Sequence, residues 1–557
     1  MTAEPADGRP DRPSLLRSAG LVGFMTFLSR ITGMLQSRLV ANYLGAGLAA
    51  DAFMVAFRIP NLLRRFTAEG TMTAAFLPTV SEVEAAQGEA AGRDMVARFL
   101  GTLGLLLTLL CVLSLPAMSL FTGLQMLGKL APDVRWWQQL GVLGQVLAGT
   151  RPASAQWVLT TVLARIMFPY LVLVSITAGL SAVLNLRGRF GLPASVSTFW
   201  NLAFISFAYA CLHWGPARWR APERAALLLA LATLVGGLVQ LFVLWPSFRR
   251  LGFGIRWGLF LRHPGVRSAL KRMVPGLMGT GIHPINVVVS TILASQLAVG
   301  AQTVLFNSNM MGEMVLGIFA ASVATVRLPV MSRLVVAGDT QGLRTSLAGA
   351  LRGTAVLVIP GAVGMAVLAQ PIIAVIFQTG RYGADAVAWT ARTLAFQAVG
   401  LLFIASGRIA AQCLYALKEY RQPVYAALLG MVVNATASIL LMGPLGTAGI
   451  ALANGVASLA GLAFLTAALR RKLGRLPYRE VLGGWAAMAL AAAAMGVLAW
   501  AGARWLGLQV FQGLGPASLR LFPLIALCTL VYAVLLTVFR LPEAQALKAM
   551  ILRRLRR

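Results

Sequence analysis

The sequence predicts an all-α integral membrane protein with about 14 transmembrane helices. Three observations predict this fold class. First, 58% of the 557 residues are hydrophobic and the mean hydropathy is +0.77, more than a globular chain needs for its core. Second, charged residues make up only 12% of the chain and leave long uncharged stretches. Third, these stretches reach the length of about 20 residues with which a helix crosses the hydrocarbon core.

The predicted spans follow one another with mostly short connections. They lie near residues 16–42, 49–80, 96–121, 157–186, 193–214, 224–246, 270–298, 302–335, 345–377, 385–416, 423–443, 446–469, 482–503 and 518–540. Pro60 is expected to bend the second span, because proline lacks a backbone N–H and clashes with the preceding helical turn.

A short internal repeat divides the chain into two halves of the same orientation. Leu77–Ser81 and Leu328–Ser332 both read Leu-Pro-x-x-Ser and end the second and eighth spans. Parallel repeats are common in transporters, where the substrate path lies between the halves. The expected domains are an N-terminal tail (1–15), two six-helix halves (16–250 and 265–470), two extra C-terminal helices (480–540) and a basic tail (541–557).

The formal net charge of +31 comes mostly from Lys and Arg in alternate loops. The basic segments lie near 187–189, 249–272, 418–421, 470–479 and 553–557. Cytoplasmic loops of membrane proteins carry such an excess of Lys and Arg. The charge therefore predicts a multi-pass membrane protein with both termini in the cytoplasm, and no nucleic-acid partner.

Cysteines and histidines show no pattern of a metal or catalytic site. The four cysteines lie far apart without a CxxC spacing, and the three histidines are scattered. We therefore expect no catalytic residue, no metal ligand and no cofactor.

Charges inside the first two spans are the informative feature, because an arginine at mid-membrane costs about 2.5–3.5 kcal/mol on insertion scales. Five of them lie close together: Arg30, Asp51, Arg64, Arg65 and Glu69. A net-positive cluster suits an anionic substrate, since guanidinium donors match phosphate oxygens. The arginines are expected to bind the substrate, and the two acids to orient them and hold a gate. The alternative is an internal ion-pair network that only locks the helix bundle.

Other charged residues also lie inside predicted spans. For some of them, the alternative is a position near the end of a span, from which the long side chain reaches the membrane interface. These other in-span charges are Arg38, Arg58, Arg165, Glu313, Arg327, Arg392 and Arg408.

Several motifs resemble one known family, the MurJ (MviN) lipid II flippases. The most specific is PNLLRR at 60–65 followed by AEG at 68–70. Further motifs are SRITG at 29–33, LGAG at 44–47, DAF at 51–53, AFLP at 75–78, PY at 169–170, FQ at 377–378 and GPL at 443–445. Together they span nearly the whole chain.

The resemblance implies a fold of the multidrug/oligosaccharidyl-lipid/polysaccharide exporter superfamily. It implies that the chain moves lipid II, an undecaprenyl-pyrophosphate-linked peptidoglycan precursor, from the inner to the outer leaflet by alternating access. The functional arginines would be Arg30 and Arg64, with Asp51 and Glu69 as the matching acids, and helices 480–540 would form a groove for the lipid tail. The implied partners are this anionic lipid, membrane lipids and the cell-wall synthesis machinery, and the energy source would be a coupling ion or the membrane potential.

Three positions depart from the family pattern. Gln36 and Met310 stand where the family carries arginines, and Ser290 stands where some members carry an acid linked to sodium. These departures leave the coupling ion and the exact lipid-linked glycan open.

The alternatives are a flippase for another polyprenyl-pyrophosphate glycan, a drug exporter and a membrane glycosyltransferase. A drug or cation exporter would need an acidic cavity, whereas this cluster is basic. A glycosyltransferase would need acids at an outer loop, where the first half offers few, such as Asp51, and no DxD motif occurs.

Overall fold

The computed structural model describes residues 12–67, 76–130, 138–280, 282–508, 511 and 513–542. Within these ranges the chain is helical and holds no strand, only an isolated bridge between Thr379 and Tyr382. The all-α prediction is therefore confirmed. The chain forms two compact units: unit 1 comprises Met1–Leu44, Ala52–Gly123 and Val146–Gly281, and unit 2 comprises Gly45–Asp51, Leu124–Gln145 and Ile282–Arg557.

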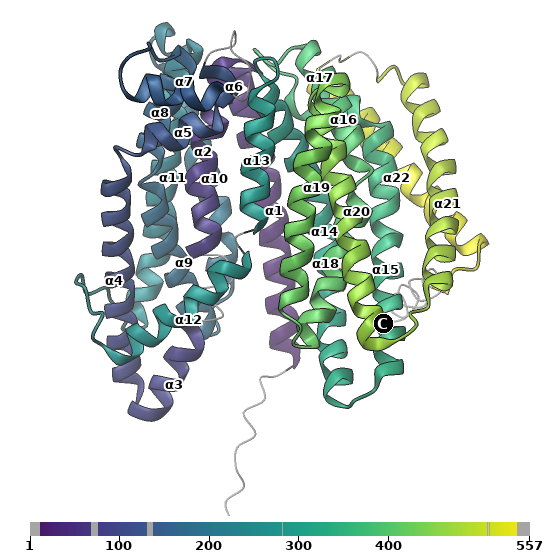
Figure 1. Cartoon of the computed structure of the whole chain (residues 1–557), viewed down its shortest axis with the longest axis horizontal. Helices are drawn as coiled ribbons and strands as arrows, with labels where there is room; N and C mark the ends of the chain where they lie inside the picture. The colour runs from purple at the N-terminus through teal and green to yellow at the C-terminus, as the bar shows by residue number, and fades with distance from the viewer. Residues whose placement is uncertain are drawn as a thin grey trace, which may run out of the picture. The chain divides into compact units, whose positions relative to one another are not determined.

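Unit 1 is built from long helices that pack side by side (Figure 1). Its α-helices are α1 (Arg12–Leu44), α2 (Leu48–Thr67, from Ala52), α3 (Leu77–Gln87), α4 (Glu89–Ser114), α5 (Met118–Gln125), α8 (Ala155–Met167), α9 (Tyr170–Leu186), α10 (Gly191–Tyr209), α11 (Pro222–Arg250) and α12 (Pro264–Thr280). A π-turn (Ala210–Trp214) and a 3₁₀ turn (Ala217–Arg220) join α10 to α11.

Unit 2 contains the remaining helices. They are α6 (Leu127–Leu130), α7 (Gln139–Leu147), α13 (Ile282–Ser295), α14 (Ala301–Val336), α15 (Thr340–Val367), α16 (Ala369–Phe377), α17 (Ala384–Ala398), α18 (Leu401–Ala416), α19 (Arg421–Leu445), α20 (Thr447–Leu473), α21 (Tyr478–Trp505) and α22 (Leu514–Val538). Helices α19 and α20 lie side by side in Figure 1, and α21 packs on α15.

Nine stretches among the described residues are long and apolar enough to cross a membrane, and α17 with α18, bent by 44° at their junction, would make a tenth. Each of these stretches overlaps a predicted span. Helix α2 is not among them, because four charges, at Asp51, Arg58, Arg64 and Arg65, fall within its 20 residues. The helix continues through Pro60. The total of about 14 spans stays a prediction.

The boundary between the units differs from the boundary of the sequence repeat. The repeat assigns residues from 265 onward to the second half, whereas α12 belongs to unit 1. Helix α12 packs on α3 and α4, and Arg272 of α12 donates a hydrogen bond to Glu82 of α3 at 2.8 Å. The two C-terminal helices α21 and α22 are part of unit 2.

Close helix packing in unit 1 depends on glycine. A Cβ at Gly236 of α11 would lie 2.7 Å from the Trp200 ring of α10, so a side chain there would push the two helices apart. Trp200 also stacks on Phe57 of α2 with ring centroids 6.0 Å apart. These contacts hold α2, α10 and α11 around one aromatic cluster.

Candidate functional site

Arg30 lies on a part of α1 that is fixed to α10. The Asn201 amide of α10 donates to the Ser29 carbonyl at 3.0 Å and to the Thr32 hydroxyl at 2.9 Å. Gly33 also lies in this contact, and a Cβ there would be in ordinary van der Waals contact with the same amide nitrogen, at 3.5 Å. These bonds set the register of α1 on both sides of Arg30.

Arg30 is itself half-buried. Its guanidinium makes no hydrogen bond and no ion pair with any residue that the structure describes. A cation held inside a helix bundle without an acid partner favours an anionic ligand, because an isolated buried charge is costly.

Arg64 lies near the end of α2 and is also half-buried. Its Nε donates to the Asn61 side chain at 3.1 Å, which fixes the direction of the side chain. Arg65 is part of α2, but its side chain is outside the described set, and Glu69 lies outside the described residues. The expected role of Glu69 in orienting the arginines therefore stays a prediction.

Asp51 binds the start of α14 in unit 2. It is fully buried, and its carboxylate accepts bonds from the Gly300 N–H at 2.7 Å, the Thr303 N–H at 2.8 Å and the Thr303 hydroxyl at 2.7 Å. A carboxylate at a helix N-terminus is stabilised by the unpaired N–H groups and the helix dipole. The hydrogen bonds that the structure shows for Asp51 thus serve helix capping, and its predicted role in orienting arginines remains untested.

Polar side chains continue along α14 from this cap. Asn307 donates to the Tyr382 hydroxyl at 3.3 Å. Gln397 of α17 accepts from Ser308 at 2.5 Å and donates to Asn309 at 2.7 Å. These bonds hold α14 against α17 next to Met310, the position without the expected arginine.

An ion pair follows less than one turn beyond Met310. Arg408 of α18 donates to Glu313 of α14 at 2.9 Å, and the two side chains are 43% and 49% exposed. Charges on a lipid-facing surface would be costly, so a half-exposed pair inside two spans is expected to line water. The sequence marked both residues as in-span charges, but 95 positions separate them and no local spacing relates them.

The other in-span arginines have different surroundings. Arg165 donates from Nε to the Leu115 carbonyl at 3.2 Å, which is a structural contact. Arg392 is exposed on α17, Arg58 is buried, and the side chain of Arg327 is outside the described set.

Ser290 belongs to an uncharged polar cluster around the buried Asn434. The Asn434 amide of α19 donates to Ser290 at 3.0 Å and to Asn286 at 2.9 Å, both on α13. No group of three or more His, Cys, Asp or Glu that could hold a metal occurs among the described residues.

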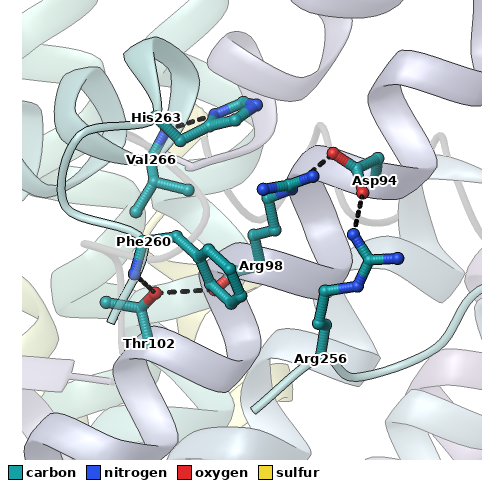
Figure 2. A network of polar contacts seen from close by, with 7 residues as sticks. All are labelled: Asp94, Arg98, Thr102, Arg256, Phe260, His263 and Val266. Atoms are coloured by element: carbon teal, nitrogen blue, oxygen red, sulfur yellow. Dashed lines mark hydrogen bonds and ion pairs between the residues drawn. The ribbon is translucent and has the colours of Figure 1, made fainter. Parts of the chain in front are cut away.

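A polar network in unit 1 attaches the loop between α11 and α12 to α4. Figure 2 shows the guanidinium groups of Arg98 and Arg256 directed at Asp94. The nitrogen–oxygen distances of these two hydrogen bonds are 2.5 and 3.1 Å. Thr102 accepts from the Phe260 N–H at 3.1 Å, and the Arg98 guanidinium lies 5.0 Å from the centre of the Phe260 ring. All these groups have protein partners, so we interpret the network as structural.

Comparisons with known proteins agree with one another. Residues 40–519 match the family model described as "Lipid II flippase MurJ". A relative from Vibrio cholerae, named probable lipid II flippase MurJ, is 31% identical over 519 residues, covering 90% of this chain and 94% of the relative.

Solved structures show the same fold. A lipid II flippase MurJ in an inward closed conformation superposes with a TM-score of 0.70 at 21% identity, covering 93% of this chain and 99% of that one. An inward-facing multidrug resistance MATE family transporter of the MOP superfamily gives a TM-score of 0.63 at 11% identity, covering 80% and 95%.

Proposed function

Because the chain belongs to the lipid II flippase MurJ family, we propose that it moves lipid II from the inner to the outer leaflet of the cytoplasmic membrane. It is a multi-pass membrane transporter and not an enzyme. The transported lipid is used in peptidoglycan biosynthesis. Both termini lie in the cytoplasm, because the loops on their side of the membrane carry the excess of Lys and Arg.

One observation within the chain carries the proposal. Arg30 is fixed in position by the bonds of Asn201 to α1, yet its guanidinium has no partner among the described residues. A pyrophosphate supplies the acceptor oxygens that such a group lacks. Arg64, oriented by Asn61, and Arg65 add positive charge on α2.

The transport step follows from the charge of the substrate. Arg30 and Arg64 hold the pyrophosphate while the isoprenoid tail stays in lipid, and the two halves rock to expose the head to the other side. A membrane potential that is negative inside favours outward movement of a net anionic substrate. No cofactor takes part in this scheme.

Other substrates have less support. A flippase for another polyprenyl-pyrophosphate glycan would use the same arginines, and Gln36 and Met310 leave room for it. A cationic drug is disfavoured, because Arg30 and Arg64 would repel it.

Complementation tests the proposal. In a strain depleted of its own flippase, Arg30→Ala and Arg64→Ala should fail to restore growth, while the exposed Arg392→Ala should restore it at equal membrane abundance. Full rescue by both Arg30→Ala and Arg64→Ala would refute the pyrophosphate site. Failure of the unaltered chain to rescue, together with export of a different lipid-linked glycan, would favour the second substrate.

A further inference from the structure

Unit 2 contains an apolar cavity that the transport scheme does not use. It has a volume of about 310 Å³ and lies between α15, α18, α20 and α21. Its floor is buried at Leu347, Ala410 and Leu469. Two of its lining residues, Leu459 and Leu482, are 46% and 58% exposed, so the cavity opens onto an apolar surface of the kind that faces lipid tails.

One arginine lines this apolar cavity. The Nε of Arg344 is buried and has no acceptor, and the guanidinium makes no hydrogen bond or ion pair with the described part of the chain. A Cβ at Gly474 would lie 2.9 Å from its Nη2, so the guanidinium sits directly against the turn between α20 and α21. Trp485 also lines the cavity, and its indole N–H is buried without a partner. A cation and an N–H donor in an apolar wall together indicate a missing anionic acceptor.

The turn beside Arg344 is strongly basic. Residues 470–480 contain five cations and one acid, Glu480. Of the cations, Lys472 is paired with Glu419 at 2.6 Å, and Arg470, Arg471, Arg475 and Arg479 are exposed. The cavity therefore joins an apolar space to a positive rim, which matches a lipid with an acyl chain and an anionic head.

We propose that this cavity binds one acyl chain of an anionic phospholipid of the surrounding leaflet, with the phosphate on Arg344. The volume is at the small end of ligand sites, which suits a single chain. The exposed arginines of the turn add attraction at the headgroup level, and the Trp485 N–H reaches an ester oxygen. The site does not depend on the transported substrate.

Native mass spectrometry of the delipidated full chain tests the site. The protein is titrated with phosphatidylglycerol or phosphatidylcholine of identical acyl chains. Phosphatidylglycerol should bind about tenfold more tightly, the size of one charge-assisted hydrogen bond. Arg344→Gln should abolish this preference and Arg344→Lys should keep most of it. The matched control Arg479→Gln, on the same turn but outside the cavity wall, should keep it within about twofold.

A second variant tests the acyl chain. Ala348→Phe fills the cavity and should weaken the binding of both lipids. If this variant does not fold, the comparison of Arg344→Gln with Arg479→Gln tests the proposal by itself. Equal affinity for the two lipids in the unaltered chain, or equal effects of those two arginine variants, would overturn the proposal. Binding of undecaprenyl phosphate that Ala348→Phe abolishes, without an effect on phosphatidylglycerol, would assign the cavity to the substrate tail and overturn it as well.

Discussion

Asp51 holds Thr303 by two hydrogen bonds at once, 2.8 Å from the backbone nitrogen and 2.7 Å from the hydroxyl. The contact joins positions 252 residues apart and fixes the beginning of α14. Helix α14 also carries Asn309, Met310 and Glu313, so Asp51 fixes the start of the helix on which these residues lie.

Loss of this cap should destabilise the protein. Asp51→Ala leaves the buried Gly300 and Thr303 N–H groups without acceptors and should lower the free energy of unfolding by about 2–4 kcal/mol, and Asp51→Asn by about 1 kcal/mol. Thermal unfolding of the detergent-purified chain measures this. Asp385→Ala, an exposed acid in the first turn of α17, is the control. An equal decrease in the unfolding temperature of Asp51→Ala and Asp385→Ala would contradict the capping role of Asp51.

The Glu313–Arg408 pair can be tested by exchange of its charges. If Arg408 contacts the anionic substrate, Arg408→Ala should reduce transport by about tenfold, and the double variant Glu313→Arg/Arg408→Glu should not restore it. A purely structural ion pair predicts recovery in the exchanged variant. Initial rates of transport in proteoliposomes, with Arg392→Ala as control, distinguish a substrate contact of Arg408 from a purely structural ion pair.

The loop between α11 and α12 should be released when its anchor on α4 is removed. Asp94→Asn weakens the attachment of Arg256, so the amide of Arg256, which donates to the Ala97 carbonyl at 3.0 Å, should exchange with deuterium about tenfold faster. Glu223→Gln, an exposed acid at the other end of α11, should leave that rate unchanged. Unchanged exchange in Asp94→Asn would show that the backbone bonds alone hold the loop.

The Glu82–Arg272 pair should make stability depend on pH. The hydrogen bond from Arg272 lowers the pKa of Glu82 from its usual value of 4.5. A carboxyl with a lowered folded-state pKa contributes stability above pH 4.5 and loses it as the pH falls through the lowered pKa. The difference in melting temperature between the unaltered chain and Glu82→Gln should therefore become smaller as the pH is lowered. If the difference in melting temperature stays constant below pH 4.5, the Glu82–Arg272 pair is not its cause.

The apolar helices could be predicted from the sequence because their signal is local. The stretch Glu89–Ser114 overlaps the predicted span at 96–121, and Leu514–Val538 overlaps 518–540. Breaks inside spans were not predicted: the stretch 157–186 is divided at Pro169 into α8 and α9, and 345–377 is divided at Leu368 into α15 and α16. Apolar composition is the same on both sides of such breaks, so hydropathy cannot locate them.

The candidate site could be predicted only in part. The presence of Arg30 and Arg64 inside spans follows from composition and spacing. The contact of Asn201 with α1 beside Arg30 and the pairing of Glu313 with Arg408 depend on which helices pack together, whereas Asn61 lies only three residues before Arg64 on the same helix. Long-range partners of this kind leave no periodic signal in one sequence, and Asp51 shows that an in-span acid can serve a helix end.

The central claim is that Arg30 binds the pyrophosphate of lipid II, and reconstituted transport tests it most directly. Proteoliposomes containing the unaltered chain and a fluorescent lipid II should show inner-to-outer movement of the label, reported by a quencher confined to one side. Arg30→Ala should lower the initial rate at least tenfold, while Arg392→Ala should keep it. Equal rates for the unaltered chain and Arg30→Ala would contradict the account.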